Sequence, residues 1–486
     1  MRYVHHNLSS FFQAFLSKNT CLILVLSFIS IGGRFYAQGP ASICYFGRAA
    51  LDFRTLPPTP LTNSAIVHYS EGTASICDEN GELLFYSNGG NSALAPGSFG
   101  AVYNKYHEVM ENGELMDSAG CFSSYQGIIA VPFPKSNRDL QQNLYYLFTR
   151  DCLESSFNSA ATNDGLTYSV IDMNANNGAG KVISKFNSLV PYQVNGGQMT
   201  VHEPLAAIQH ANGKDYWLFS YTLNKLHRLL VTENGISDFH LYEDIPFEPR
   251  GRIVISPAKN FLCTGKSLFA FNPENAALNF IGDFSDDNVP AFSSNGKLIY
   301  AIENKVLYQY NLENPNIFGS RTLIANLNNN YQLYLSPNAM IYLFASNTSN
   351  LPGVIRCANS IGASCNFSML PTSLNGMSCG LEFTNVMPHY LYYDGPDCAI
   401  TTVNEIDASQ ANIFPNPNDG NFNIHWPKGF MGDIDIYALN GQLISRQKVL
   451  DFQNKIQLQV HHPGVYIIQF LDALRNHTYH KKLIIH

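Results

Sequence analysis

A repeated hairpin unit constrains the fold of this 486-residue chain more than any other feature. Each copy has an apolar strand, a polar turn that contains Gly, Asn or Ser-Pro, and a second apolar strand, as in residues 252–261. The turns at Ser256, Ser293 and Ser336 recur at intervals of about forty residues, which is typical of propeller blades of four strands. A small sheet cannot bury both of its faces alone, so such units are expected to stack around an axis.

We therefore predict an all-β chain whose main domain, residues 38–396, is a β-propeller. Seven blades are expected, with six or eight as alternatives. Residues 380–386 are predicted to close the ring by adding a strand to a blade that begins near residues 43–53. Residues 87–116 and 151–165 exceed ordinary hairpin lengths and are predicted to be functional insertions.

The N-terminus has the pattern of a signal peptide. An apolar run at 21–31 follows a weakly basic segment and is too short to span a bilayer. We predict a signal peptide over residues 1–37, cleaved after Ala37, with an uncleaved anchor as the alternative. No later run of about eighteen apolar residues occurs, so no membrane-spanning segment is expected after cleavage.

The charge of the chain argues against a nucleic-acid partner. The signal segment holds Arg2, Lys18 and Arg34 and no acid, so its removal takes the net charge from −8 to −11. A phosphate backbone requires a basic surface for binding. We therefore expect no nucleic-acid partner.

The C-terminal stretch, residues 412–486, has the pattern of a small Ig-like β-sandwich. An Asn440-Gly441 pair between apolar runs is a strong hairpin signal, and Pro463-Gly464 marks a second turn before residues 465–468. The polar residues 397–411 are predicted to be a linker.

Four motifs in this stretch resemble the C-terminal sorting domain of type IX secretion substrates of Bacteroidetes-type bacteria. They are N-P-x-x-G, Y-A-L-N-G, G-V-Y and K-K-L-I-I, in the order of the family, although Ala438 stands where the family often has Asp. The resemblance implies export through the periplasm to the outer cell surface or the extracellular space, and the type IX machinery as a partner. A purely structural appendage is the alternative. The sorting-motif residues are Asn416, Pro417, Gly420, Gly441, Gly464, Tyr466, Lys481 and Lys482.

The start of the main domain resembles propeller-type families of large secreted Bacteroidetes proteins, some associated with gliding or adhesion. The resemblance rests on residues 45–53, 71–86 and 102–110. It implies architecture and compartment, and it transfers no catalytic residue.

Motifs for catalysis are missing from the sequence. There is no G-x-S-x-G, and His202-Glu203 lacks the second His of a zinc protease. Glu71, His107, His202 and Glu203 lie near predicted strand or loop ends, where they either meet in a site or serve as surface and turn residues. We name no catalytic residue and no metal ligand, and the ligand-binding residues stay unknown.

Two acidic loops suggest calcium as an alternative to the expected absence of a cofactor. One holds Asp283, Asp286 and Asp287, and the other holds Asn416, Asn418 and Asp419. Oxygen ligands suit calcium, but neither loop has the spacing of a known calcium loop, and these residues also make turns. His461, His462 and His486 show no paired metal spacing.

Cysteine usage fits an oxidising destination. The chain has ten cysteines, of which Cys21 leaves with the signal peptide. Cys357 and Cys365 are close enough to close a short loop, whereas Cys77 and Cys263 are expected to be buried thiols.

These observations favour a secreted or cell-surface protein whose propeller is a binding, adhesion or interaction module for an extracellular protein or glycan. A secreted propeller hydrolase or lyase acting on extracellular glycan or peptide is the alternative.

Overall fold

The computed structural model divides the chain into two compact units, Met1–Asp397 and Cys398–His486. The domain boundaries given above stay predictions. Cleavage after Ala37 also stays a prediction, because the signal segment lies outside the described residues. The structure describes residues 39–67, 71–90, 100–115, 123–134, 143–151, 165–190, 194–195, 198–199, 203–222, 225–243, 251–285, 290–394, 411–472 and 477–486.

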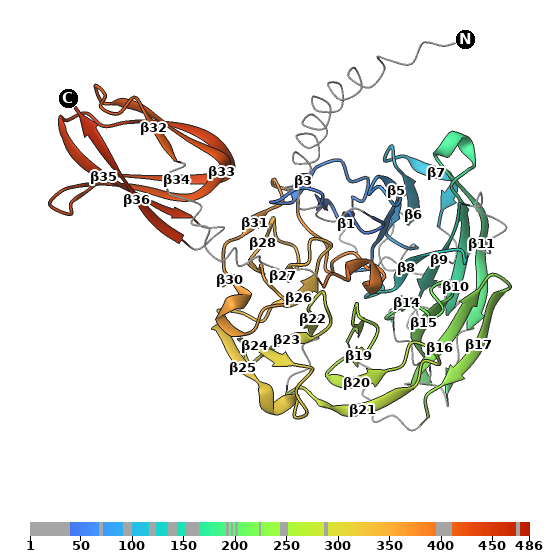
Figure 1. The fold of residues 1–486 in the computed structure, drawn as a ribbon. Helices are drawn as coiled ribbons and strands as arrows, with labels where there is room; N and C mark the ends of the chain where they lie inside the picture. Colours follow the sequence, from blue (N-terminus) through green and yellow to red (C-terminus); the bar gives the residue numbers. More distant parts are fainter. Residues whose placement is uncertain are drawn as a thin grey trace, which may run out of the picture. The chain divides into compact units, whose positions relative to one another are not determined.

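Small antiparallel sheets make up the first unit (Figure 1). A three-stranded sheet, β1-β2-β3, is followed by an eight-stranded sheet that contains two four-stranded meanders. A single parallel pairing, between Glu111 of β7 and Lys181 of β11, joins these two meanders. Four further sheets of four strands and two short sheets of two strands complete the unit among the described residues.

The elements of the first unit have the following bounds. They are β1 (Ile43–Phe46), β2 (Ala49–Asp52), β3 (Thr59–Leu61), β4 (Ala74–Cys77), β5 (Leu83–Ser87), β6 (Ala101–Asn104), β7 (Val109–Glu114), β8 (Ile128–Pro132), β9 (Leu144–Arg150), β10 (Leu166–Asp172), η2 (Asn176–Gly178), β11 (Lys181–Val190), β12 (Val194–Asn195), β13 (Gln198–Met199), β14 (Ala206–Gln209), β15 (Tyr216–Thr222), β16 (Lys225–Thr232), β17 (Gly235–Leu241), β18 (Ile253–Ile255), β19 (Phe261–Thr264), β20 (Ser267–Phe271), β21 (Leu278–Asp283), β22 (Ala291–Phe292), β23 (Leu298–Glu303), β24 (Val306–Asn311), η3 (Phe318–Ser320), β25 (Thr322–Asn326), β26 (Gln332–Leu335), β27 (Ile341–Phe344), β28 (Asn350–Leu351), β29 (Gly353–Ile355), η4 (Gly362–Cys365), β30 (Phe367–Ser368), β31 (Thr372–Ser373) and η5 (Pro388–Leu391).

Strand β1 explains why the sheets stack through both faces. Successive side chains of a strand point to opposite faces, and all four residues of β1 are buried. Ile43 and Tyr45 pack in one cluster with Tyr86 of the following sheet, whereas Phe46 packs in another with Phe344 of the last sheet. Because the first and last sheets share a core cluster, the stack closes into a ring.

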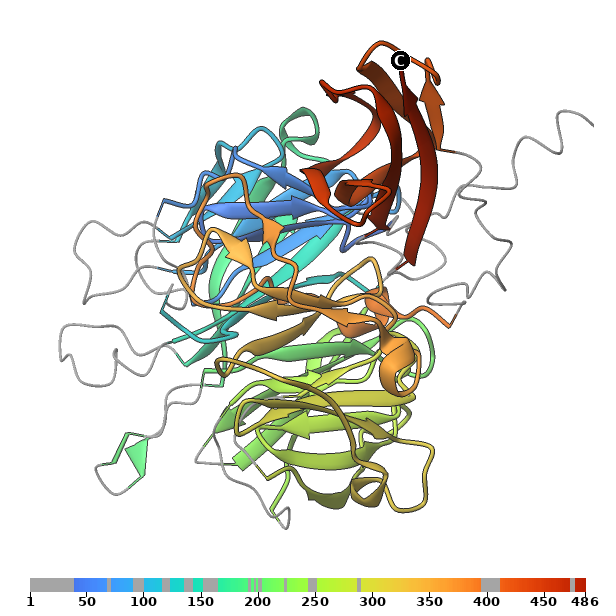
Figure 2. The same ribbon diagram turned by 90° about the vertical axis from the view of Figure 1, so that its left-hand side faces the viewer.

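The same two-sided packing recurs between the remaining neighbours. An apolar cluster joins the β4–β7 meander to the β8–β11 meander. Further clusters join the β8–β11 meander to the sheet of β14–β17 and then each sheet to the next, up to the sheet of β26–β30. Figure 1 shows these sheets arranged around a common centre, and Figure 2 shows the same sheets from the side. The prediction of an all-β chain with a propeller is thereby confirmed, while the count of seven blades stays a prediction.

Strand direction separates the connections into two faces of the ring. Neighbouring strands of a meander alternate in direction, so every second connection lies at the same end. One end, called here the long-loop face, carries five long connections. The other end, the short-turn face, carries tight turns such as 78–82, 256–260 and 293–297. The long connections are 62–73, 88–100, 115–127, 151–165 and 191–205.

The two predicted insertions have different outcomes in the structure. The segment 87–116 is not one insertion, because it contains β6 and β7, two regular strands of a sheet. Only its first part, 88–100, is a long connection. The segment 151–165 does connect β9 to β10 on the long-loop face, although most of it lies outside the described residues.

The segment that closes the ring comprises residues 379–393 and is called the axial segment. The Gly380 amide donates to Phe46 O at 3.0 Å, and an isolated bridge joins Gly47 to Cys379. The predicted closing segment therefore lies against β1 as expected. It forms this bridge without a regular strand, because its later residues direct their hydrogen bonds to other sheets.

Asn385 connects three successive sheets near the ring centre. Its backbone amide donates to Thr73 O at 2.8 Å, and its side-chain amide donates to Ile128 O at 3.0 Å and Leu205 O at 2.9 Å. These carbonyls lie at or next to the first strands β4, β8 and β14. The axial segment then forms η5, which lies at the centre of the ring in Figure 1.

The axial segment ends on the short-turn face. The Tyr393 amide donates to Ser294 O at 3.2 Å, within the turn that follows β22. Ser294 Oγ and Asn359 Nδ2 both donate to Tyr393 O at 3.1 Å. The segment thus bonds to sheets on both sides of the ring and passes from one face to the other.

The second unit is a single five-stranded sheet around one apolar core. Its strands follow the order β32-β33-β35-β36, with β34 paired to β33. Ile424 and Ile434 are both buried in this core although they lie ten residues apart on β33, so the long strand bends over the core. The predicted sandwich is thus built from one continuous sheet. The strands are β32 (Asn412–Phe414), β33 (Asn421–Ala438), β34 (Leu443–Gln459), β35 (Gly464–Asp472) and β36 (His477–Ile485).

The cysteines correct one expectation. Cys357 is disulfide-bonded, but Cys365 is a free, buried thiol, so the two do not form the predicted short loop. Cys365 instead packs into the core between two sheets, and its backbone carbonyl accepts from the Cys357 amide at 2.9 Å. Cys77 and Cys263 are buried free thiols, as predicted. In the described part of the chain, no helix is long and apolar enough to cross a membrane.

We predict that Asn385→Ala lowers the free energy of unfolding by about 2 kcal/mol, because the carbonyls of Ile128 and Leu205 lose their donor near the ring centre. Urea unfolding of the full mature chain measures the change. Asn279→Ala is the matched control, since Asn279 is exposed on the outer strand β21 and should change stability by less than about 0.5 kcal/mol. Equal effects of the two substitutions would contradict a role for Asn385 in holding the ring.

Candidate functional site

A buried carboxylate, Glu382, lies at the start of the axial segment. Its side chain is 2% exposed, and both of its oxygens accept hydrogen bonds. Tyr334 Oη donates to Oε1 at 3.0 Å, and the backbone amide of Gln126 donates to Oε2 at 2.7 Å. Residues of two sheets therefore meet the axial segment at one carboxyl group.

Arg252 supplies the positive charge beside this carboxyl group. Its Nε lies 3.7 Å from Glu382 Oε1, and its guanidinium carbon lies 3.9 Å from the centre of the Tyr334 ring. Its Nη2 donates to Leu333 O at 2.9 Å. Burial raises the pKa of Glu382 to about 7, against the lowering effects of Arg252 and of the two hydrogen bonds.

Gln126 joins the same cluster to the neighbouring sheet. Its Nε2 donates to Ile253 O at 2.9 Å, and its Oε1 accepts from the Ile253 amide at 2.9 Å. The side chain thus completes a backbone-like pairing with the start of β18. Gln126 therefore links Glu382, which accepts from its backbone amide, to Ile253, the residue next to Arg252.

Two of the four residues singled out in the sequence lie next to this cluster. Glu203 Oε2 accepts from the Tyr125 amide at 2.9 Å, directly before Gln126. The charge of Glu71 raises the pKa values of both Tyr125 and Glu382, after burial as the main cause. Glu203 thus lies next to the residues of this cluster, and Glu71 acts on two of them through its charge.

A second buried cation extends the charged layer. Arg150 is 4% exposed, and its Nη2 donates to Tyr221 O at 2.9 Å. Burial lowers its pKa to about 10, while Asp151 and Glu203 act in the opposite direction. His227 is fully buried nearby, and burial together with the Arg150 charge lowers its pKa to about 3. Both groups lie between the sheets of β8–β11 and β14–β17.

The space beside Glu382 is too small for a polymer substrate. The cavity has a volume of about 90 Å³ and is lined by Gln126, Arg252, Tyr334 and Glu382 together with apolar residues of the axial segment. This volume holds roughly three water molecules. A general acid must reach the group that it protonates, and Glu382 is instead enclosed by the chain's own donors.

A larger and more open depression lies between the first two sheets. We call it the Tyr106 groove. It has a volume of about 420 Å³, within the range of small-molecule sites. The groove is lined by Ile43, Tyr45, Leu61, Asn63, Glu82, Leu83, Lys105, Tyr106 and His107.

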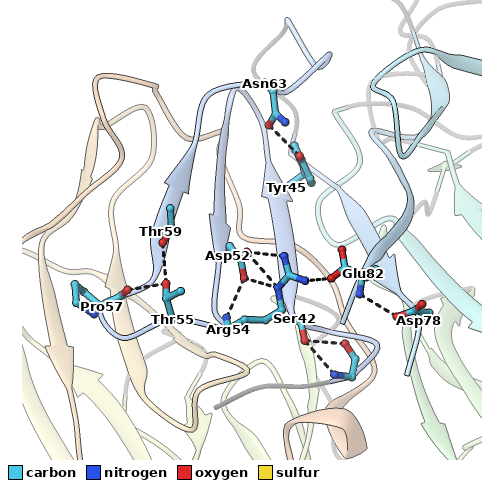
Figure 3. A network of polar contacts seen from close by, with 11 residues as sticks. Ser42, Tyr45, Asp52, Arg54, Thr55, Pro57, Thr59, Asn63, Asp78 and Glu82 are labelled. Carbon is cyan, nitrogen blue, oxygen red and sulfur yellow. Dashed lines mark hydrogen bonds and ion pairs between the residues drawn. The ribbon is translucent and has the colours of Figure 1, made fainter. Parts of the chain in front are cut away.

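A polar network fixes one wall of this groove (Figure 3). Arg54 lies between two carboxylates, with its Nη2 2.8 Å from Asp52 Oδ2 and its Nη1 in contact with Glu82. The Glu82 amide donates to Asp78 Oδ1 at 2.9 Å. Glu82 is therefore held at the groove by both its backbone and its side chain.

His107 lies in the groove and away from Glu71 and Glu203. Its Nε2 lies 2.7 Å from Asn63 Nδ2, and its Nδ1 lies 3.3 Å from Tyr86 Oη. Burial lowers its pKa from the ordinary value. The four residues singled out in the sequence thus do not form one site, because His107 belongs to the groove and His202 lies outside the described residues.

Sequence reasoning missed Glu382 and Tyr106 as candidate residues. Glu382 is the one charged residue in a predicted closing strand, which is an available signal for a buried functional or structural carboxylate. Tyr106 stood within a motif of family resemblance, and nothing in the sequence marks it as exposed.

The described residues of the two acidic loops accept hydrogen bonds from the chain itself. Asp283 Oδ1 accepts from Ser267 Oγ at 2.7 Å, and Asp286 and Asp287 lie outside the described residues. Asn418 Oδ1 accepts from the Gly420 amide at 2.7 Å, and Asp419 accepts from the Asn421 amide. No group of three or more His, Cys, Asp or Glu side chains with metal-binding geometry occurs in the described ranges.

The N-P-x-x-G motif fastens the C-terminal strand of the second unit. Asn416 Nδ2 donates to Lys482 O at 2.8 Å, and Asn416 Oδ1 accepts from the Ile484 amide at 2.9 Å. Gly420 has a φ of +107°, and a Cβ there would lie 2.5 Å from Val460 O. Glycine is therefore required by both conformation and space.

The other motif residues shape turns and the edge strand. Gly441 has a φ of +84° in the turn between β33 and β34. Tyr466 Oη donates to His462 O at 2.8 Å, and the residue follows Gly464 at the start of β35. Lys481 and Lys482 lie on β36, where lysines protect an open sheet edge from pairing with another chain.

Comparison with known proteins identifies the second unit. Residues 412–486 match the family described as the secretion system C-terminal sorting domain. The resemblance inferred from the four motifs is thereby confirmed. The class of protein is a type IX secretion substrate with a propeller-type main domain, exported toward the cell surface or the extracellular space.

The main domain has only distant structural likenesses. No curated protein sequence matches the chain. The structure is similar to a candidate 6-phosphogluconolactonase from Bacteroides fragilis, at 12% identity and a TM-score of 0.43, covering 71% of this chain and 98% of the other. It is also similar to PorZ, a surface component of the type IX secretion system of Porphyromonas gingivalis, at 11% identity and a TM-score of 0.29, covering 92% and 74%. At these scores the likenesses carry no argument about activity.

We predict that Glu382→Gln removes a pH dependence of stability. The folded-state pKa of Glu382 is raised from about 4.5 to about 7, so its stabilising effect is fully present below pH 4.5 and is lost as the pH rises to 7. The difference in the free energy of unfolding between the wild type and Glu382→Gln should therefore fall by about 1 to 3 kcal/mol between pH 4.5 and pH 8. Urea unfolding at several pH values measures it, and Glu233→Gln in a surface turn is the control. A difference that does not change with pH contradicts the prediction.

Proposed function

We propose that the exported chain acts outside the cell as a binding or adhesion module, and that its propeller carries the contacts to an extracellular protein or glycan. The observation that supports this proposal is the contrast between its two candidate sites. The Glu382 cluster is closed by the chain's own hydrogen bonds, whereas the Tyr106 groove is open, aromatic and polar.

The alternative is a secreted hydrolase or lyase. It draws support from Glu382, whose pKa of about 7 is suited to proton transfer near neutral pH. Its weakness is access, because both oxygens of this carboxyl group already accept hydrogen bonds from the chain itself beside a small cavity of about 90 Å³. We therefore place binding before catalysis.

The proposed partners and compartment follow from the two units. The signal peptide would bring the chain to the periplasm of a Bacteroidetes-type bacterium, where the type IX machinery would recognise the sorting domain. The propeller would then face an extracellular partner on the outer surface or after release.

We predict that a chain ending at Val403 stays in the periplasm of the producing bacterium, whereas the full chain reaches the cell surface or the medium. The truncated chain lacks the whole sorting domain. Cell fractionation followed by immunoblotting measures the distribution. Equal export of both chains would show that the domain has only a structural role.

A matched pair of substitutions tests the sorting domain without shortening the chain. Gly420→Ala should reduce export, because the new Cβ would lie 2.5 Å from Val460 O and distort the motif loop. Gln457→Ala should be exported nearly as well as the wild type, since Gln457 is an exposed residue of β34 outside the four motifs.

Binding and catalysis are separated by one experiment with insoluble polymers. The mature chain is incubated with cellulose, chitin, starch and collagen, and both the bound fraction and the released reducing ends or amines are measured. We expect retention on at least one polymer without release of product. Release of product that stops in Glu382→Gln would support the hydrolase alternative instead.

A further inference from the structure

The Tyr106 groove has the features of a site for a small polar ligand with an apolar face. Its walls come from separate parts of the chain: β1, the residues after β3, the turn before β5 and the turn between β6 and β7. Tyr106 is 60% exposed, which is unusual for an aromatic side chain on a regular turn. Neither the closure of the ring nor the sorting domain accounts for this exposed ring.

The turn that carries Tyr106 is rigidly built. Asn104 Oδ1 accepts from the Tyr106 amide at 2.8 Å and from the Glu108 amide at 3.2 Å. The His107 amide donates to Asn104 O at 3.0 Å, and His107 has a φ of +65°. A residue other than glycine in this conformation costs free energy, and such residues are concentrated at functional sites. The turn therefore presents Lys105, Tyr106 and His107 in a fixed arrangement.

A stack of buried aromatic rings supports the groove from behind. The Tyr45 and Tyr86 rings stack at a centroid distance of 4.0 Å, and the Tyr86 and Tyr103 rings stack at 5.2 Å. Tyr45 borders the groove and is 1% exposed, so it is fixed by the core. Tyr106 is therefore the aromatic side chain of the groove that a ligand could contact.

The polar groups of the groove are linked in a chain with defined protons. Tyr45 Oη donates to Asn63 Oδ1 at 3.0 Å, so the Asn63 amide group is turned toward His107. His107 Nε2 then accepts from Asn63 Nδ2, which leaves the proton of the neutral imidazole on Nδ1, beside Tyr86 Oη. The lowered pKa of His107, caused by burial, agrees with a neutral ring. Asn63 keeps one further donor and one further acceptor position for a ligand.

The charges around the groove favour a neutral ligand. Among the lining residues, Glu82 and Lys105 carry opposite charges, and His107 is neutral. Glu82 is also paired with Arg54, as Figure 3 shows. An anionic ligand such as a nucleotide would need an excess of positive charge, which these lining residues do not provide.

We propose that the Tyr106 groove is a binding site for a neutral pyranose sugar, as a free unit or as part of a glycan. A pyranose ring has an apolar C–H face, which packs against the exposed face of an aromatic ring such as Tyr106. Its hydroxyl groups are donors and acceptors at once, which matches the carboxylate of Glu82, the ammonium of Lys105 and the amide of Asn63. The inference rests on the proposed binding function and names the ligand class and the site.

The test is binding of methyl glycosides of glucose, galactose, mannose and N-acetylglucosamine, and of maltotriose, cellotriose and chitotriose, to the full mature chain. Saturation-transfer NMR detects binding, and calorimetry measures the dissociation constant. We expect at least one of these sugars to bind. Tyr106→Ala should weaken its binding by tenfold or more, whereas Tyr106→Phe should stay within about threefold of the wild type because the stacking face is kept.

Tyr392→Ala is the matched control. Tyr392 is 49% exposed and lies on the axial segment, outside the groove, so its replacement should leave sugar binding unchanged. Thermal unfolding of both alanine variants confirms that they fold.

Three outcomes would overturn the proposal: no sugar of the panel binds, Tyr106→Ala binds as well as the wild type, or glucuronate binds in place of the neutral sugars. These outcomes are distinguishable from a failure of the proposed function. Retention of the chain on collagen together with no binding of any sugar would keep the binding function and reject the sugar site. No retention on any polymer together with no sugar binding would reject both.

Discussion

The structure of the main domain depends on one constraint: each small sheet has two apolar faces and must bury both. Strand β1 satisfies it by packing Tyr45 against the following sheet and Phe46 against the last one. Once every sheet does the same, the row must close on itself, because an open row would leave two apolar faces in water. The axial segment then connects the inner ends of the sheets through the hydrogen bonds of Asn385.

Closure by the axial segment also shapes the chemistry of the centre. The same residues that complete the ring bring Glu382 between Arg252 and Tyr334, where burial raises the pKa of its carboxyl group. A carboxyl group in this position stabilises the closed ring most when it is protonated or fully paired. The centre of the propeller is thus occupied by the chain itself, and surface available to a ligand lies between and beyond the sheets.

The two units divide the biological task. The second unit, with its motif loop fastened to β36 by Asn416, carries the export address. The first unit offers a fixed turn with an exposed aromatic ring and five long connections on one face.

The sequence by itself determined the strand pattern, the propeller class and the sorting domain. Alternation and turn residues act over a few positions, so Gly441 could be placed in a hairpin and the residues near 380–386 could be assigned to ring closure. Sequence could not bring together residues such as Tyr45, Asn63 and His107, or Gln126, Arg252 and Glu382. Their meeting depends on how the sheets stack, which no local spacing encodes. Tertiary structure alone therefore decided that Glu71 and Glu203 lie near a closed carboxylate, that His107 belongs to an open groove, and that Cys365 stays a free thiol.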